Sequence, residues 1–119
     1  MAIEWSDNIT LAKLSDEPSL SEELASLIDR LAKADPDQTP HVVLDFSDCT
    51  YVNSSNIAQL LRLSKQLKGA GRQLRLAAMG DDVWSVMLVT GLDKVFRVAP
   101  DTLTALAGLQ LEDPNAGEG

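Results

Sequence analysis

The 119-residue chain has little of the chemistry on which most catalytic sites depend. It contains one cysteine, Cys49, and one histidine, His41. A single cysteine excludes an internal disulfide and a cysteine-based zinc cluster, and a single histidine argues against most transition-metal sites. The spacing of the two residues still leaves a Cys/His pair open, although a lone cysteine in an apolar setting is usually a small core residue.

Long apolar runs are also missing. No run approaches the roughly 18 residues that a membrane-spanning helix requires. The beginning of the chain, "MAIEWSDNIT", lacks the basic and apolar segments of a signal peptide. We therefore expect a cytoplasmic protein with no direct membrane insertion. Apolar residues make up 45% of the chain and charged residues 24%, which is typical of one globular domain with a single core.

Basic residues are few, because ten Lys and Arg stand against 18 Asp and Glu and the net charge is −8. Residues 1–48 contain 11 acids and 3 bases, residues 49–97 contain 3 and 7, and residues 98–119 contain 4 and none. A chain this acidic is a poor ligand for nucleic acid, because neutralising phosphates requires a basic surface. The positive middle segment is suited to an acidic protein partner.

Several sequence motifs of phosphate and acyl chemistry are absent. The chain has no GxxxxGK[ST] and no GxSxG, and the "GAG" at residues 69–71 follows a predicted helix, where a dinucleotide-binding loop would follow a strand. Asp45 and Asp48 leave open a cation site of the response-regulator kind, although no third carboxylate or well-placed lysine is evident. We therefore expect no cofactor, no metal ion and no enzymatic activity.

The hydrophobic pattern predicts an α/β domain over residues 1–110, with a flexible polar tail at 111–119. Its element order is ββαβαβαβα, in a four- to five-stranded mixed sheet with about four helices. The predicted strands cover residues 3–6, 8–14, 41–46, 72–79 and 94–98, and the predicted helices cover residues 15–35, 56–68, 80–91 and 100–110. Ser19 or Ser21 is expected to cap the first helix, and Pro100 is expected in the first turn of the last one.

Residues 51–67, "YVNSSNIAQLLRLSKQL", join the end of one predicted strand to the start of a leucine-rich helix. In a sheet of this type such a junction lies at the carboxyl edge, where ligands and partners usually bind. A serine hydroxyl at this position caps the helix, and a phosphate on it would be stabilised by the free N–H groups of the first turn. A plain helix cap and a regulatory serine therefore both remain open.

The helix after the two serines is amphipathic. Ile57, Leu60, Leu63 and Leu67 share the face that is expected to pack on the sheet, and Arg62, Lys65, Lys68 and Arg72 form a basic arc beside it. This arc is either a solvated stripe or a docking surface for an acidic partner, with Leu61 at its border as an apolar anchor. Trp84 in the next helix is a second potential anchor, although core burial is the more common place for a tryptophan.

The segments "VVLDFSDCTYVNSSNIAQLLRLSKQLKGAGRQLRLAAM" and "VTGLDKVFRV" resemble the STAS domain of bacterial anti-sigma factor antagonists. Proteins of this family have a buried strand of the VVLDLS kind, a D-S-S-G motif, a leucine-rich helix and a late TGLxxxF segment. The resemblance extends over roughly residues 8 to 109. It implies a protein-binding regulatory module whose partner is an anti-sigma factor that is also a serine kinase.

The resemblance also implies a site. By position in the D-S-S-G motif, Ser54 is the serine that the partner kinase phosphorylates, and phosphorylation ends binding. The predicted partner-binding surface combines the motif neighbours of this serine, Asn53, Ser55 and Asn56, with Leu61, Arg62 and Lys65 from the exposed side of the helix.

Two positions depart from the motif, because Asn53 stands where the family has Asp and Asn56 stands where it has Gly. Asn53 retains the shape of a cap without the carboxylate, and Asn56 adds a side chain where a partner is expected to approach closely. These departures keep a second hypothesis open, in which the chain is a non-phosphorylated STAS subunit of a larger complex. Lipid-asymmetry ABC transporters and stress-signalling scaffolds are complexes of this kind.

Overall fold

The computed structural model describes residues 2–5 and 8–112, which form one mixed α/β domain. Its elements in chain order are β1 (Ala2–Trp5), β2 (Ile9–Ser15), α1 (Ser19–Lys33), η1 (Pro36–Gln38), β3 (His41–Asp48), α2 (Ser54–Gly69), β4 (Leu74–Ala77), α3 (Asp81–Thr90), η2 (Leu92–Lys94), β5 (Arg97–Ala99) and α4 (Thr102–Glu112). The predicted fold class and element order are therefore confirmed.

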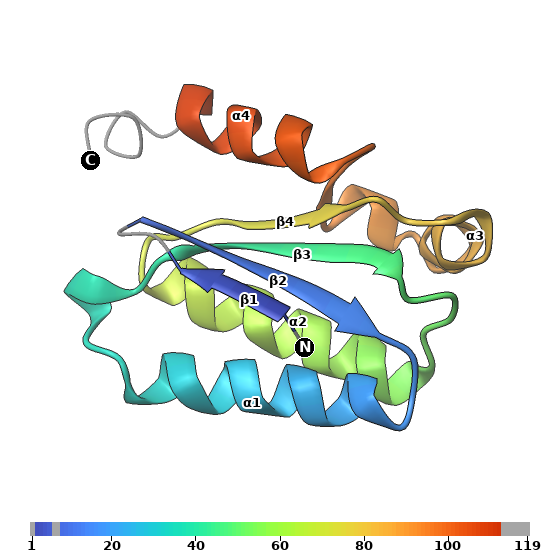
Figure 1. The fold of residues 1–119 in the computed structure, drawn as a ribbon, viewed down its shortest axis with the longest axis horizontal. Helices are drawn as coiled ribbons and strands as arrows, with labels where there is room; N and C mark the ends of the chain where they lie inside the picture. Colours follow the sequence, from blue (N-terminus) through green and yellow to red (C-terminus); the bar gives the residue numbers. More distant parts are fainter. Residues whose placement is uncertain (1, 6–7, 113–119) are drawn as a thin grey trace.

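The five strands form one sheet in the order β1-β2-β3-β4-β5. β1 is antiparallel to β2, and every other neighbouring pair is parallel. Helices α1 and α2 cover one face of the sheet, α4 lies over the other, and α3 lies at the end where β3 and β4 finish (Figure 1). The carboxyl ends of the parallel strands thus meet at a single edge, next to the start of α2 and α3.

The apolar run of β3 explains why helices lie on both faces. Val42, Leu44 and Phe46 pack in the large core between the sheet and the α1–α2 layer, whereas Val43 packs under α4 with Ala105 and Leu109. Successive strand residues point to opposite faces of the sheet. An uninterrupted apolar run therefore requires an apolar layer on each face.

The leucines of the two neighbouring helices complete the large core. Four leucines of α1 and three of α2 are buried, and they recur at the spacing that puts them on one side of each helix: Leu20, Leu24, Leu27, Leu31, Leu60, Leu63 and Leu67. Ile57 packs against this core while remaining partly exposed. The predicted inner face of α2 is therefore confirmed.

Two predicted helix starts are wrong. Pro18, not Ser19 or Ser21, occupies the N-cap position of α1, and it makes no side-chain cap bond. Pro100 lies before α4, where Asp101 Oδ1 accepts a hydrogen bond from the backbone N–H of Thr104 at 2.7 Å. A carboxylate satisfies a first-turn N–H group, which proline cannot do.

The strand predicted at residues 94–98 is also shorter than expected. α3 ends at Gly91, whose φ of 75° is in the left-handed region, and η2 then directs Phe96 into the core, where it is 4% exposed. Burial of Phe96 in this turn leaves only Arg97–Ala99 to pair with β4. At the other end of the domain α4 continues through Glu112, two residues into the predicted tail, and residues 113–119 lie outside the described part.

Within residues 2–5 and 8–112, no helix combines the length and the apolar character that crossing a membrane would require.

The core predicts a contrast between two leucines of α2. Leu63 is fully buried, whereas Leu61 is 40% exposed. We expect Leu63→Ala to lower the free energy of unfolding by about 2–5 kcal/mol, because it leaves a cavity between α2 and the sheet. The matched Leu61→Ala substitution is expected to cost less than about 1 kcal/mol. Urea unfolding followed by circular dichroism measures both, and equal costs would contradict the assignment of the inner face.

Candidate functional site

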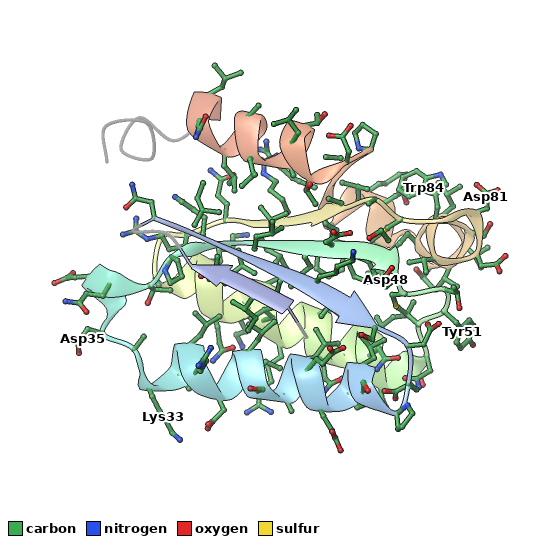
Figure 2. The ribbon with its side chains drawn as sticks, in the orientation of Figure 1. Lys33, Asp35, Asp48, Tyr51, Asp81 and Trp84 are labelled. Atoms are coloured by element: carbon green, nitrogen blue, oxygen red, sulfur yellow. The ribbon has the colours of Figure 1, made fainter. Side chains whose placement is uncertain are left out.

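The junction between β3 and α2 lies at the carboxyl edge of the sheet, together with the loops before α1 and α3. Figure 2 shows Asp48, Tyr51, Asp81 and Trp84 at this end of the molecule and Lys33 and Asp35 at the opposite end. Tyr51 projects from the β3–α2 loop and is 60% exposed. The NSSN segment follows it directly, so Asn53 and Ser54 belong to the same edge.

An asparagine caps α2, so the prediction that a serine hydroxyl does so is wrong. Asn53 Oδ1 accepts a hydrogen bond from the backbone N–H of Asn56 at 2.9 Å, and Asn56 Oδ1 accepts one from the backbone N–H of Asn53 at 2.9 Å. This reciprocal capping box satisfies two N–H groups at the helix start. Ser54 and Ser55 occupy the first turn, are exposed, and are not needed as caps.

Asn56 is a buried residue of the fold and not part of the exposed surface. Its side chain is fully buried, and its Nδ2 lies 3.4 Å from the hydroxyl oxygen of Ser21 in α1. The side chain at this motif position therefore points into the α1–α2 contact and does not project toward the solvent above Ser54. Of the residues predicted to bind a partner, Asn56 is the one that this conformation does not expose.

Two carboxylates next to the NSSN segment were not predicted as site residues. Asp16 accepts hydrogen bonds from the Thr50 backbone N–H at 2.7 Å, the Thr50 hydroxyl at 2.8 Å and the Tyr51 backbone N–H at 3.3 Å. These bonds, the Thr50 backbone bond foremost, lower the pKa of Asp16 below its ordinary value of 3.8. Asp16 thereby joins the loop before α1 to the loop before α2.

Glu17 is the second of these carboxylates. It accepts hydrogen bonds from the Ser21 backbone N–H at 2.6 Å and from the Ser21 hydroxyl at 2.5 Å. The pKa of Glu17 is lowered mainly by the Ser21 hydroxyl, and the side chains of Asn56 and Asn53 contribute smaller effects in the same direction. An ionised carboxylate therefore lies beside the cap of α2. The sequence signal that could have indicated both carboxylates is "SDEPS" at the start of the predicted helix 15–35, where Pro18 delays the helix and leaves Asp16 and Glu17 in a loop.

The exposed side of α2 continues from the serines along the helix. At about 100° per residue, Ser54, Leu61 and Lys65 fall within one narrow stripe, and Arg62 lies beside it. Leu61 is 40% exposed, and Arg62 and Lys65 are also exposed, as predicted for the basic arc. Arg72 does not belong to this arc, because its Nε donates to the Thr39 carbonyl at 2.6 Å.

Trp84 is not in the core. It is 36% exposed and lines a hollow of about 220 Å³ with Met79, Val98, Ala99 and Pro100. A neighbouring hollow of about 590 Å³ shares Met79 and Pro100 and reaches Thr50 in the β3–α2 loop. The surface at the carboxyl edge is thus recessed between the loops before α2 and α3, with Trp84 on its far side.

The alternative catalytic pair is excluded by position. His41 begins β3 and Cys49 follows its end, so the length of the strand, about 23 Å, separates them. Burial raises the pKa of the Cys49 thiol to about 11, which keeps it protonated at neutral pH. His41 Nδ1 accepts a hydrogen bond from the Gln73 backbone N–H at 2.9 Å. Both residues are buried parts of the fold.

The alternative cation site also has no support in the geometry. Asp45 Oδ1 accepts a hydrogen bond from the backbone N–H of Ser47 at 2.8 Å, and Asp48 forms an ion pair with Lys13 at 3.4 Å. Across the described ranges, no three His, Cys, Asp or Glu side chains are grouped so as to hold a metal ion.

The cap predicts opposite results for neighbouring substitutions. Asn53→Ala is expected to lower the free energy of unfolding by about 0.5–2 kcal/mol, because the Asn56 N–H loses its acceptor. Ser54→Ala is expected to be neutral or slightly stabilising, since alanine favours the helix and the Ser54 hydroxyl is not the cap. Chemical denaturation measures the free energy of unfolding of both variants. A larger loss of stability in Ser54→Ala than in Asn53→Ala would refute the asparagine cap.

The Asp16 clamp predicts a pH dependence. A carboxylate with a lowered pKa contributes stability above the unfolded-state pKa and loses that contribution as the pH falls through the folded-state value. The Tm difference between the wild type and Asp16→Asn should therefore be largest near pH 7 and narrow below the ordinary Asp value of 3.8. Glu22→Gln on α1 controls for the loss of one charge, and a Tm difference independent of pH would argue against the clamp.

Comparisons with known proteins add sequence and fold relationships. The profile of the family described as "Mlab, STAS domain" matches residues 12–104. A candidate anti-sigma factor antagonist from Thermotoga maritima has a similar crystal structure, with 16% identity, a TM-score of 0.77, and coverage of 92% of this chain and 93% of that one. An anti-sigma-factor antagonist (STAS) domain protein from Planctomyces limnophilus has 18% identity, a TM-score of 0.77, and coverage of 92% and 97%. Identities this low relate the folds alone.

Proposed function

Because this chain belongs to the STAS domain family, we propose that it is a protein-binding regulatory module of the anti-sigma factor antagonist type, switched by phosphorylation of Ser54. Its partner in this proposal is a cytoplasmic anti-sigma factor with serine kinase activity, and the chain itself catalyses no reaction. The observation that carries the proposal is the asparagine cap. Because Asn53 caps α2, the exposed Ser54 hydroxyl at the edge of the sheet is not needed to hold the start of the helix.

The electrostatics of this edge suit a switch. A neutral hydroxyl at the first turn of α2 can be covered by a partner at little cost. A phosphate would add about −1.5 to −2 charges to the first turn of α2, whose capping asparagines lie beside the Glu17 carboxylate. The helix N-terminus would stabilise the new anion within the free protein, but a partner would have to desolvate it. Phosphorylation is therefore expected to weaken binding.

The two departures from the D-S-S-G motif are compatible with this switch. Asn53 keeps the capping function that the motif requires at its position, and Glu17 supplies a carboxylate nearby. The Asn56 side chain is buried and leaves the approach to Ser54 open. We assign the partner-binding surface to Asn53, Ser54, Ser55, Leu61, Arg62 and Lys65, with Tyr51 added as an exposed aromatic anchor.

The test uses the serine kinase encoded nearest to this gene. Incubation of the protein with that kinase and ATP is expected to increase its intact mass by one phosphate, and Ser54→Ala should abolish the increase. The control Ser55→Ala, one residue along the same exposed turn, should keep it.

Binding provides the second readout. Ser54→Asp is expected to weaken kinase binding at least about tenfold by calorimetry, which corresponds to about 1.4 kcal/mol. An unchanged mass together with unchanged binding by Ser54→Asp would overturn the proposed switch.

A second function is favoured by the same asparagines. Asn53 and Asn56 hold each other where phosphorylated relatives have Asp and Gly, so the motif is complete as a purely structural cap. In this alternative the chain is a non-phosphorylated STAS subunit of a larger complex, such as a lipid-asymmetry ABC transporter or a stress-signalling scaffold. Stoichiometric co-purification with an ABC-transporter ATPase or a scaffold, and not with a kinase, would favour it.

A further inference from the structure

α4 is the outer layer on its side of the sheet, and its outward face is apolar and without charge. Figure 1 shows α4 over the face of the sheet opposite to α1 and α2. Ala105 and Leu109 of this helix are buried against the sheet, whereas Leu103 is 76% exposed and Leu111 is 87% exposed. Residues 102–111 contain no Asp, Glu, Lys or Arg. Two large apolar side chains are therefore exposed to water on an uncharged stretch of helix.

The outward side chains of α4 form a ridge. Leu103, Ala107 and Leu111 are four residues apart and all exposed, and at about 100° per residue they lie within an arc of roughly 80°. The ridge is high at its two leucine ends and low at Ala107 in its middle. Ridges with this spacing pack beside one another when two helices cross at about 50°, and a small residue at the crossing point lets the backbones approach closely.

A shallow groove runs beside this ridge, because the next row of the helix surface holds only Thr104 and Gly108. Thr104 is exposed and Gly108 is partly exposed. Glycine inside a helix is less favourable than alanine, and nothing in the described part of the chain requires it here. Gly108 is not among the glycines with positive φ, and a Cβ at this position would meet no described atom within 4 Å. The missing side chain leaves open space on the surface of α4, into which a side chain of another molecule fits.

Shape and charge together indicate a second copy of this chain as the occupant. The ridge and the groove lie side by side on one face, so a two-fold axis next to Ala107 sets the ridge of each copy into the groove of the other, as an isologous interface requires. Each copy has a net charge of −8, so two copies approach closely only where like charges do not meet. The outward face of α4 meets this condition, whereas α1, α2 and α3 each have exposed charged residues, such as Glu22, Lys65 and Asp81.

Other occupants of this face are less well matched. Residues 113–119, "DPNAGEG", contain no large apolar side chain with which to cover two leucines. Residues 98–119 contain 4 acids and no base, which opposes binding of this part of the chain to an anionic membrane surface.

We propose that α4 is the interface of a two-fold symmetric dimer of this chain, in which the ridge of each copy lies in the groove of the other and the two Ala107 side chains meet at the crossing point. Because α1 and α2 lie on the other side of the sheet, both copies keep the surface around Ser54 open. The dimer presents two such surfaces, so a partner with two binding sites gains avidity. The interface requires neither Ser54 nor its phosphorylation, so it goes beyond the proposed switch.

The first test is the oligomeric state of the full chain, measured by sedimentation velocity over a wide range of concentrations. One pair of short helices buries less than the roughly 800 Å² per partner of a standard interface, so we expect a dimer that dissociates on dilution. Its dissociation constant should fall as salt is added, because salt screens the repulsion between two acidic chains and leaves an apolar contact in place.

Gly108 provides a variant in which folding and association change in opposite directions. Gly108→Ala is expected to raise the Tm of the dilute protein, because alanine favours the helix, and to weaken the dimer about tenfold, because the new Cβ narrows the groove. Gly108→Leu fills the groove and should abolish the dimer while circular dichroism shows a folded chain.

Two matched pairs of variants locate the contact. Leu111→Gln is expected to weaken the dimer about tenfold, whereas Val89→Gln on α3 should leave it unchanged, although both side chains are 87% exposed. A short bismaleimide cross-linker should join two copies of Ala107→Cys and not two copies of Val89→Cys, and the native Cys49 does not compete because it is buried. Ser54→Asp should leave the dissociation constant of the dimer within about twofold, so the dimer and the switch fail separately.

The proposal is overturned by any of three results. A chain that stays monomeric at every concentration would mean that a different protein, or none, covers the ridge. A dimer that Gly108→Leu and Leu111→Gln leave unchanged would place the contact elsewhere on the molecule. A dimer that weakens as salt is added would mean that ion pairs, and not the uncharged face of α4, hold the two copies together.

Discussion

β3 has to be covered on both of its faces, and the arrangement of the molecule follows from that requirement. Val42 and Leu44 need one apolar layer and Val43 needs another, because neighbouring strand residues point in opposite directions. α1 and α2 supply the first layer and α4 supplies the second. Since β2 to β5 are parallel, the same arrangement brings the loops before α1, α2 and α3 to one edge. The candidate site is therefore a consequence of how the core is closed.

At that edge, the residues that cap α2 and the serine of the proposed switch are neighbours in the chain. Asn53 and Asn56 satisfy each other's backbone, so the start of α2 is stable without a serine hydroxyl. If a serine hydroxyl capped the helix, phosphorylation would remove that cap. Phosphorylation of Ser54 would leave the cap intact, because Asn53 provides it. The same pair of asparagines accounts for both the proposed switch and its structural alternative, because a complete cap neither requires nor prevents phosphorylation.

Polar side chains join α1 and the loop before it to α2 and the loop before it. Asp16 and Glu17 approach the cap from the loop before α1, and Gln59 and Gln66 reach α1 from the opposite direction.

The sequence by itself determined the fold class, the element order and the inner face of α2, because apolar spacing records which side of each element is buried. It also determined that Leu61, Arg62 and Lys65 lie outside. Only the tertiary structure decided that Asn53 caps α2, that Asn56 and Arg72 turn inward, that Trp84 stays at the surface and that His41 and Cys49 are far apart. Asn56 and Arg72 turn inward because of contacts between residues distant in the chain, Asn56 with Ser21 and Arg72 with Thr39. Local periodicity contains no information about such pairs, since the competing partners of a polar side chain become neighbours only when the helices pack.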